Sequence, residues 1–159
     1  MTEIDRAIDD AASAIGHSAM IRQLTVAVCE SLTSGQIAAT LGAVQDASQW
    51  FAGGLVAYRN ETKFDVLDIP EGPVVTAECA EQMASRIRKL TRADVAVSVT
   101  GVGGPGPEEG REAGTVFIGV SSPRGSRAFE HRFHGDPEVV VKHTVHGALR
   151  HLQGAMLDS

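Results

Sequence analysis

Residues 24–35 read LTVAVCESLTSG, and this stretch predicts a strand, a tight turn and the start of a helix. Its first half is apolar and carries the β-branched residues Thr25, Val26 and Val28, which favour a strand. Ser31 then follows in the turn, close to where a helix with unpaired N–H groups and a positive dipole end would begin. Such a turn can bind an anion or stabilise an oxyanion, and Ser31 is a candidate nucleophile that needs a base.

The segments around that turn predict an α/β fold. Hydrophobic spacing and turn residues indicate helices at 3–15, 34–41, 60–67, 76–90 and 139–152, and strands at 24–30, 51–58, 94–100, 115–121 and 127–133. Alternating helices and strands are typical of a sheet with helices on both faces, and the last two strands predict a hairpin. We therefore expect residues 1–159 to form a single α/β domain with a mixed sheet and helices on both of its faces.

Composition narrows the classes of protein to consider. The 159 residues are 43% hydrophobic and carry a net charge of −6, which argues against a nucleic-acid partner. No apolar run approaches the roughly 18 residues that a membrane span requires. The acidic N-terminus lacks the basic start of a signal peptide, so we expect a cytoplasmic protein. Cys29 and Cys79 form no C-x-x-C motif and are expected to be buried thiols.

A glycine-rich segment at 101–106, GVGGPG, matches the G-x-G-x-x-G pattern of dinucleotide-binding proteins. That site needs a helix beginning inside the motif, which Pro105, Pro107 and Gly110 prevent. A dinucleotide site is therefore not expected. Two interpretations stay open: a backbone concavity that offers N–H groups to an anionic ligand, or a flexible turn.

Lys63 is the candidate base for Ser31. It would lie one turn into a helix that begins near Asn60, just after a strand that ends at Tyr58. A lysine acts as a general base when burial or neighbouring groups lower its pKa, although a solvated surface lysine is the alternative. The six histidines show no metal-binding spacing; His143 and His146 share a helix face and suit surface or capping positions.

Seven motifs in this order resemble one family. They are ESLTSG (30–35), ASQWFAGGLVAY (47–58), NETK (60–63), GPVV (72–75), VSVTGVGGP (97–105), GTV (114–116) and FHGD (133–136). Together they are similar to the C-terminal domain of the competence/damage-inducible protein CinA, a family that includes stand-alone nicotinamide-nucleotide amidohydrolases. The resemblance runs from about 24 to 152, nearly the whole chain.

The resemblance implies a three-layer α/β/α sandwich with a mixed, mostly parallel sheet. It also implies a Ser/Lys amidohydrolase that uses no metal and no cofactor. Ser31 would be the nucleophile and Lys63 its general base, with Tyr58 and Ser48 assisting proton transfer or orienting the pair. Backbone N–H groups near Thr33 would form an oxyanion hole. The substrate-binding positions implied are Glu30, Thr33, Asn60, Thr100, Gly101, Gly103 and Gly104.

The implied reaction converts nicotinamide mononucleotide to nicotinic acid mononucleotide and ammonia. The resemblance also implies a small-molecule nucleotide as partner, no nucleic acid or membrane, and a homo-oligomer, either a dimer or a tetramer. Pro137 and Val141 stand where the family usually has basic residues that could meet a phosphate. This difference keeps a second hypothesis open, a catalytically diverged nucleotide-binding or interaction module of the same fold.

Overall fold

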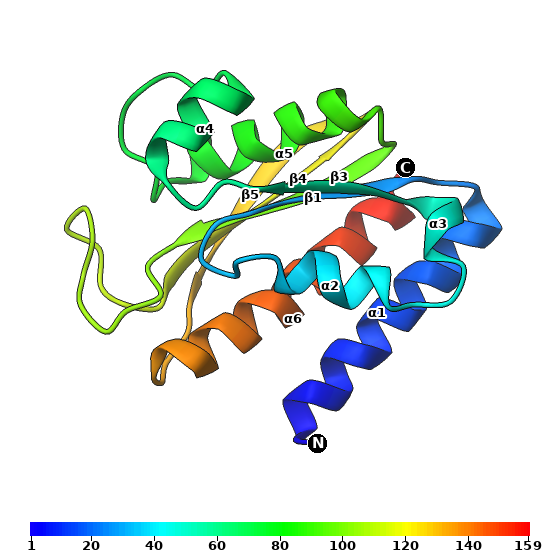
Figure 1. Cartoon of the computed structure of the whole chain (residues 1–159), viewed down its shortest axis with the longest axis horizontal. Coiled ribbons are helices and arrows are strands. Elements are labelled where there is room, and N and C mark those ends of the chain that lie inside the picture. Colours follow the sequence, from blue (N-terminus) through cyan, green and yellow to red (C-terminus); the bar gives the residue numbers. More distant parts are fainter.

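A five-stranded sheet forms the centre of the molecule, and helices cover both of its faces (Figure 1). The computed structural model describes all residues, 1–159. The elements in chain order are α1 (Glu3–Arg22), β1 (Val26–Glu30), α2 (Gln36–Gly42), α3 (Ala47–Trp50), β2 (Phe51–Val56), α4 (Asn60–Leu67), α5 (Ala77–Thr91), β3 (Val95–Gly101), β4 (Thr115–Ser122), β5 (Gly125–Arg132) and α6 (Pro137–Leu157). None of the helices combines the length and the apolar composition that crossing a membrane would require.

The sheet is mixed and mostly parallel, as the sequence predicts. Its strand order is β2-β1-β3-β4-β5. Strand β1 pairs in parallel with β2 and with β3, whereas β4 is antiparallel to both β3 and β5. Four of the five strands therefore run in one direction. The carboxyl ends of β1, β2 and β3 meet at one edge, where open α/β sheets bind their ligands.

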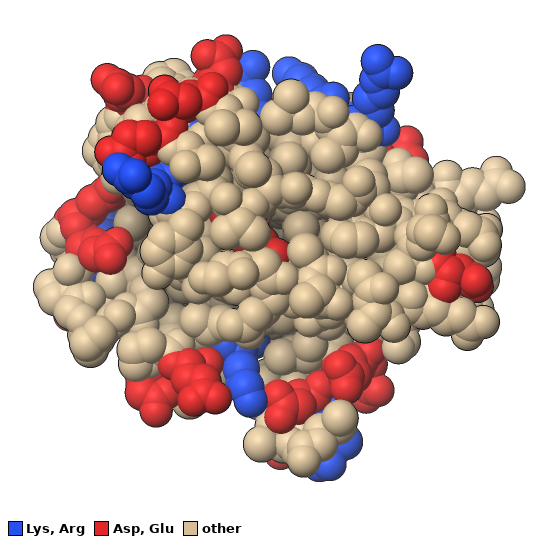
Figure 2. Space-filling view, in the orientation of Figure 1, with Lys and Arg blue, Asp and Glu red and all other residues tan.

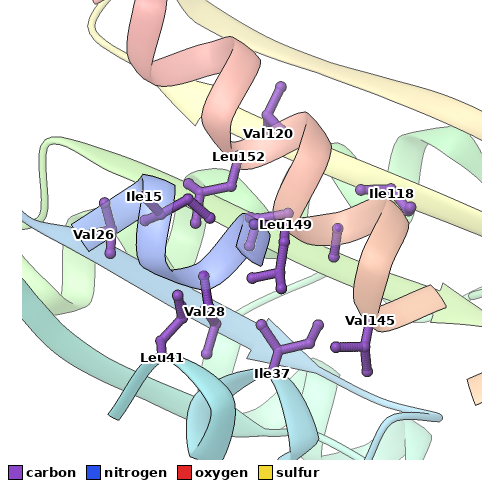
Figure 3. Packing of buried hydrophobic residues seen from close by; sticks show 14 of the residues in the cluster. Ile15, Val26, Val28, Ile37, Leu41, Ile118, Val120, Val145, Leu149 and Leu152 are labelled. Carbon is purple, nitrogen blue, oxygen red and sulfur yellow. The ribbon is translucent and has the colours of Figure 1, made fainter. Parts of the chain in front are cut away.

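Three layers result, and each face of the sheet has its own core. Helices α1, α2 and α6 lie on one side of the sheet, and α4 and α5 lie on the other (Figure 1). Figure 3 shows Ile15 of α1, Val28 of β1 and Leu149 of α6 pointing into the core of the first side. Because β1 and β3 are covered on both faces, burial is continuous along both strands up to Glu30 and Thr100 and does not alternate.

Several element boundaries differ from the sequence prediction, and one short helix is absent from it. Helix α6 begins at Pro137 rather than at 139, because the Asp136 side chain accepts a hydrogen bond from the N–H of Val139 and caps the helix. The short helix α3 was not predicted. Its single turn offers too little hydrophobic periodicity to be recognised in a sequence.

Helix α5 packs unusually close to the sheet because small residues face it. Ala27, Cys29 and Ala96 line this side, whereas the bulkier Val26 and Val28 face the other core. The Ser98 hydroxyl donates to the Ala80 carbonyl of α5 over 2.5 Å. A Cβ atom added to Gly119 of β4 would lie 2.2 Å from that same carbonyl oxygen. The α5–sheet distance therefore depends on a glycine at 119.

Substituting Gly119 by alanine is expected to destabilise the protein by about 3 kcal/mol, since the new methyl group meets rigid backbone. Gly154 of α6 is the matched control, because a Cβ there meets nothing within 4 Å. The Gly154→Ala protein should be about 0.5–1 kcal/mol more stable than wild type, as expected for alanine in a helix interior. Urea unfolding of both variants measures the two effects, and equal effects would contradict the proposed close packing.

Candidate active site

Ser31 and Lys63 meet at the carboxyl edge of the sheet. Ser31 is the first residue beyond β1, and Lys63 projects from the first turn of α4. The Lys63 Nζ atom lies 3.2 Å from the Ser31 Oγ atom, 2.8 Å from the Ala57 carbonyl oxygen and 3.5 Å from that of Tyr58. Ser31 is 8% exposed and Lys63 1% exposed, so the contact is almost closed to solvent.

Backbone pairing brings the two side chains together. Beyond the last residue of β2, the N–H of Ala57 still donates to the carbonyl of Glu30 over 2.7 Å. This bond places the end of β2 beside the residue that precedes Ser31. Helix α4 then starts three residues after Ala57. The Lys63 side chain, in the first turn of α4, therefore points back toward Ala57 at the end of β2.

Burial lowers the pKa of Lys63 below its ordinary value, because a charged amine loses its hydration there. No carboxylate forms an ion pair with it; the salt bridges of the protein all involve other cations. The neighbouring thiols supply no compensating charge at neutral pH, since burial raises the pKa of Cys29 to about 12 and that of Cys79 to about 11. The charges of Glu108 and Glu109 act in the opposite direction to burial, with a smaller effect.

The oxygen atoms around Lys63 suit a base. A neutral amine has two N–H donors and one lone pair, and the two carbonyl oxygens of Ala57 and Tyr58 can take both donors. The lone pair is then left for the hydroxyl proton of Ser31. The arrangement thus permits Lys63 to remove that proton and activate the serine.

The turn after Ser31 leaves backbone donors free. The N–H groups of Leu32 and Thr33 have no hydrogen-bond acceptor within the protein, whereas the N–H of Ser34 donates to the Ser31 carbonyl over 3.1 Å. Two unpaired N–H groups directly after a nucleophile are the donors from which oxyanion holes are built. The resemblance implies an oxyanion hole near Thr33, and these two N–H groups are the candidates for it.

Glu30 holds this turn in place from inside. Its fully buried carboxylate accepts hydrogen bonds from the Thr33 hydroxyl at 2.6 Å and from the N–H groups of Ile37 and Ala38 at 2.9 Å each. Helix α2 has no capping side chain at Gly35, so Glu30 serves as its cap. Glu30 and Thr33 were expected to bind substrate, but their side chains instead bond to each other and to α2.

The other expected substrate-binding residues lie at the same edge. Because β3 is parallel to β1, with Cys29 opposite Ser98, Thr100 and the loop after it begin beside Ser31. The Thr100 hydroxyl is buried and donates to the Val74 carbonyl over 2.9 Å, so it is not free for a ligand.

The remaining three glycines and Asn60 differ in their surroundings. Gly101 packs tightly against β4, since an added Cβ would lie 2.6 Å from the Thr115 carbonyl oxygen. Gly103 has open space around it, and Gly104 has a φ of 92°, which favours glycine. Asn60 is exposed at the start of α4. Of the expected set, Asn60 and the backbone of Gly103 and Gly104 are the groups left accessible.

No hydrogen bond joins the side chain of Tyr58 or Ser48 to the Ser31–Lys63 pair. Tyr58 is 64% exposed, and it contributes its carbonyl rather than its phenol. Ser48 is an exposed residue of α3, which precedes β2. Phe51, at the start of β2, pairs with Val26, at the start of β1, so Ser48 lies at the opposite edge of the sheet. The resemblance alone could not reveal this, because it gives order along the chain and not position in the sheet.

The Ala57 carbonyl and the position of the site relative to the hollows of the molecule cannot be predicted from the sequence. The Ala57 carbonyl is a main-chain group, and any residue at that position would provide it. A hollow of about 660 Å³ lies between α1 and the segment 40–46, and neither Ser31 nor Lys63 lines it.

Two of the six histidines, His131 and His151, form a cluster with aromatic residues of β5 and the segment after it. The Nε2 atoms of His131 and His151 lie 2.8 Å apart, and these rings stack on Phe133 and Phe129. Burial lowers the pKa of both histidines, that of His151 to about 4. No three His, Cys, Asp or Glu side chains lie close enough together to hold a metal ion. His131 and His151 thus serve the packing of α6 on β5.

The lowered pKa of Lys63 predicts a pH-dependent contribution to stability. The unfolded chain binds the Lys63 proton up to about pH 10.5, but the folded protein releases it at lower pH. Between the pKa of Lys63 in the folded protein and its pKa in the unfolded chain, the unfolded state holds more protons, so the free energy of unfolding rises with pH. The unfolding free energy of wild type minus that of Lys63→Met should therefore increase from pH 7 to pH 10, by up to about 1.4 kcal/mol per pH unit. Urea unfolding at several pH values measures it; a constant difference would contradict a lowered pKa.

Known proteins support the family suggested by the motifs. Residues 8–156 match the family model of the CinA C-terminal domain. A competence-damage inducible protein of Bacillus pumilus is 38% identical over 140 residues, which is 85% of this chain and 34% of that protein. One of Streptococcus gordonii is 47% identical over 111 residues, 67% of this chain and 27% of that protein. The chain spans about a third or less of the length of these curated relatives.

The fold gives the same assignment. The crystal structure of a CinA superfamily protein from Klebsiella pneumoniae is similar with a TM-score of 0.91 and 28% sequence identity. The match covers 96% of this chain and 99% of that chain. On both grounds, the chain belongs to the CinA C-terminal domain family.

Proposed function

We propose that this protein is a Ser/Lys amidohydrolase that cleaves the carboxamide of nicotinamide mononucleotide. The observation that carries the proposal is the buried contact between Lys63 Nζ and Ser31 Oγ, at 3.2 Å. A lysine with a lowered pKa at hydrogen-bond distance from a serine is the pairing that nucleophilic catalysis needs. The choice of substrate rests on the family resemblance.

In the proposed first half-reaction, neutral Lys63 takes the hydroxyl proton of Ser31 while the Oγ atom attacks the carboxamide carbon. The N–H groups of Leu32 and Thr33 stabilise the oxyanion that develops. Lys63, now protonated, gives its proton to the leaving nitrogen, and the carbon–nitrogen bond breaks to release ammonia. An ester between Ser31 and the nicotinoyl group remains.

The second half-reaction restores the enzyme. Water attacks the ester carbon while Lys63 takes one of the water protons, and a second oxyanion forms at the same N–H groups. The bond to Ser31 Oγ then breaks, and Lys63 returns the proton to the serine. Nicotinic acid mononucleotide leaves, so the balanced reaction consumes one water and yields one ammonia.

A second candidate function is a nucleotide-binding or interaction module without catalysis. It is favoured by Pro137, which is the first residue of α6, and by the half-buried Val141, neither of which offers a positive charge to a phosphate. Binding of nicotinamide mononucleotide without ammonia release would support this candidate, and turnover would exclude it.

The amidohydrolase proposal predicts that Ser31→Ala and Lys63→Ala each reduce ammonia release from nicotinamide mononucleotide by at least about 10³-fold. Lys63→Arg should be equally inactive at every pH, because a guanidinium does not deprotonate. The exposed Lys89 provides the matched control, and Lys89→Ala should keep the wild-type rate. Wild-type rates in folded Ser31→Ala and Lys63→Ala proteins would refute the mechanism.

A further inference from the structure

The loop between β3 and β4, residues 102–114, folds back against the active-site edge. Its two ends are joined, because the N–H of Gly114 donates to the Val102 carbonyl over 2.7 Å and the N–H of Val102 to the Thr115 carbonyl over 2.9 Å. Val102 is buried in the same core as Ala57 and Val74. The base of the loop thus belongs to the same core as Ala57, whose carbonyl accepts from Lys63.

The tip of this loop is fastened to the segment before α5 by one side chain. The Glu109 carboxylate accepts hydrogen bonds from the N–H of Val74 at 3.0 Å and from the N–H of Val75 at 2.9 Å. The Val74 carbonyl in turn accepts from the Thr100 hydroxyl. The end of β3, the Val74–Val75 segment and the loop tip are therefore linked in a closed ring of contacts.

Glu109 occupies a turn position that normally takes other residues. Glu108 and Arg111 form an isolated antiparallel bridge, and the two residues between them have positive φ angles, 51° at Glu109 and 71° at Gly110. Two-residue turns with positive φ at both positions favour asparagine, aspartate and glycine. A glutamate there is strained, and its two hydrogen bonds to Val74 and Val75 give the physical reason for its presence.

The loop tip also lies within electrostatic reach of the base. Glu108 and Glu109 are the carboxylates whose charge acts on Lys63. Figure 2 shows acidic side chains along the left of this face, where Figure 1 places α4 and the loop tip. Beside the tip, Gly72, Pro73, Val75, Thr76, Glu109 and Arg111 line an open hollow of about 440 Å³.

We propose that Glu109 is a positioning residue that fastens the loop 102–114 to Val74 and Val75 and so holds the loop in place beside the Ser31–Lys63 pair. The fastened loop presents the backbone of Gly103 and Gly104 to the substrate. Its release therefore weakens substrate binding and leaves the chemical step nearly unchanged. This kinetic consequence rests on the proposed amidohydrolase function, whereas the fastening does not.

Glu108 is a matched control for Glu109. Both residues are exposed carboxylates near Lys63, but the Glu108 side chain makes no hydrogen bond within the protein. The variants Glu109→Ala and Glu108→Ala each remove one negative charge, and only the first removes the fastening. Glu109→Gln keeps one acceptor oxygen and tests whether the fastening can be rescued in part.

Amide hydrogen exchange at Val74 and Val75 measures the fastening directly. Exchange should be at least about tenfold faster in Glu109→Ala than in wild type, intermediate in Glu109→Gln and unchanged in Glu108→Ala. With nicotinamide mononucleotide, KM should rise about tenfold in Glu109→Ala while kcat stays within about threefold. Both alanine variants should shift the rise of the rate with pH to lower pH, because each removes a charge that raises the pKa of Lys63.

Unchanged exchange at Val74 and Val75 in Glu109→Ala would overturn the proposal. If exchange is faster in Glu109→Ala but its KM equals that of Glu108→Ala, the link between the fastened loop and substrate binding is wrong. If wild type releases no ammonia, the proposed function fails on its own, and the exchange rates alone still decide for or against the fastening.

Discussion

The candidate site depends on the burial of the Lys63 amine without a carboxylate to pair with it. An isolated ammonium group is costly to remove from water, so the protein must either provide acceptors or favour the neutral form. It provides three oxygen atoms, from Ser31, Ala57 and Tyr58, and none of them carries a formal charge. These oxygen atoms give the buried amine hydrogen-bond partners. Because none of them is charged, they do not offset the loss of hydration, and the pKa of Lys63 is lowered.

The backbone around the pair follows from the same requirement. The parallel pairing of β1 and β2 continues through the Ala57–Glu30 hydrogen bond, which brings the Ala57 carbonyl to the strand end where Ser31 lies. Glu30, one residue earlier, uses its buried carboxylate to cap α2 and so fixes the turn that contains Ser31. The end of β1 thus positions Ser31, its turn and the oxygen atoms around Lys63, which links the stability of the fold to the geometry of the candidate site.

The sequence predicts those parts of the candidate site that depend on short-range patterns. The strand–turn–helix at Ser31 and the position of Lys63 one turn into a helix are short-range patterns, and the spacing of hydrophobic residues makes them predictable. The layered fold followed from the alternation of helices and strands. The motifs also predicted the family correctly.

What the sequence could not reveal depends on contacts between distant segments. Glu30 looks like a polar residue at a ligand site until α2 is seen to lack a cap. Ser48 looks close to the pair in the chain, yet the direction of β2 places it at the other edge of the sheet. Glu109 bonds to N–H groups some 35 positions away, which no local pattern records.

The measurement that tests the account most directly is the pKa of Lys63 itself. Titration of the folded protein with labelled lysine, followed by NMR at the side-chain Cε and Nζ atoms, reports the three lysines of the chain separately. The account predicts that Lys63 titrates clearly below the ordinary lysine value of about 10.4. A Lys63 that titrates at that ordinary value would contradict its role as a base.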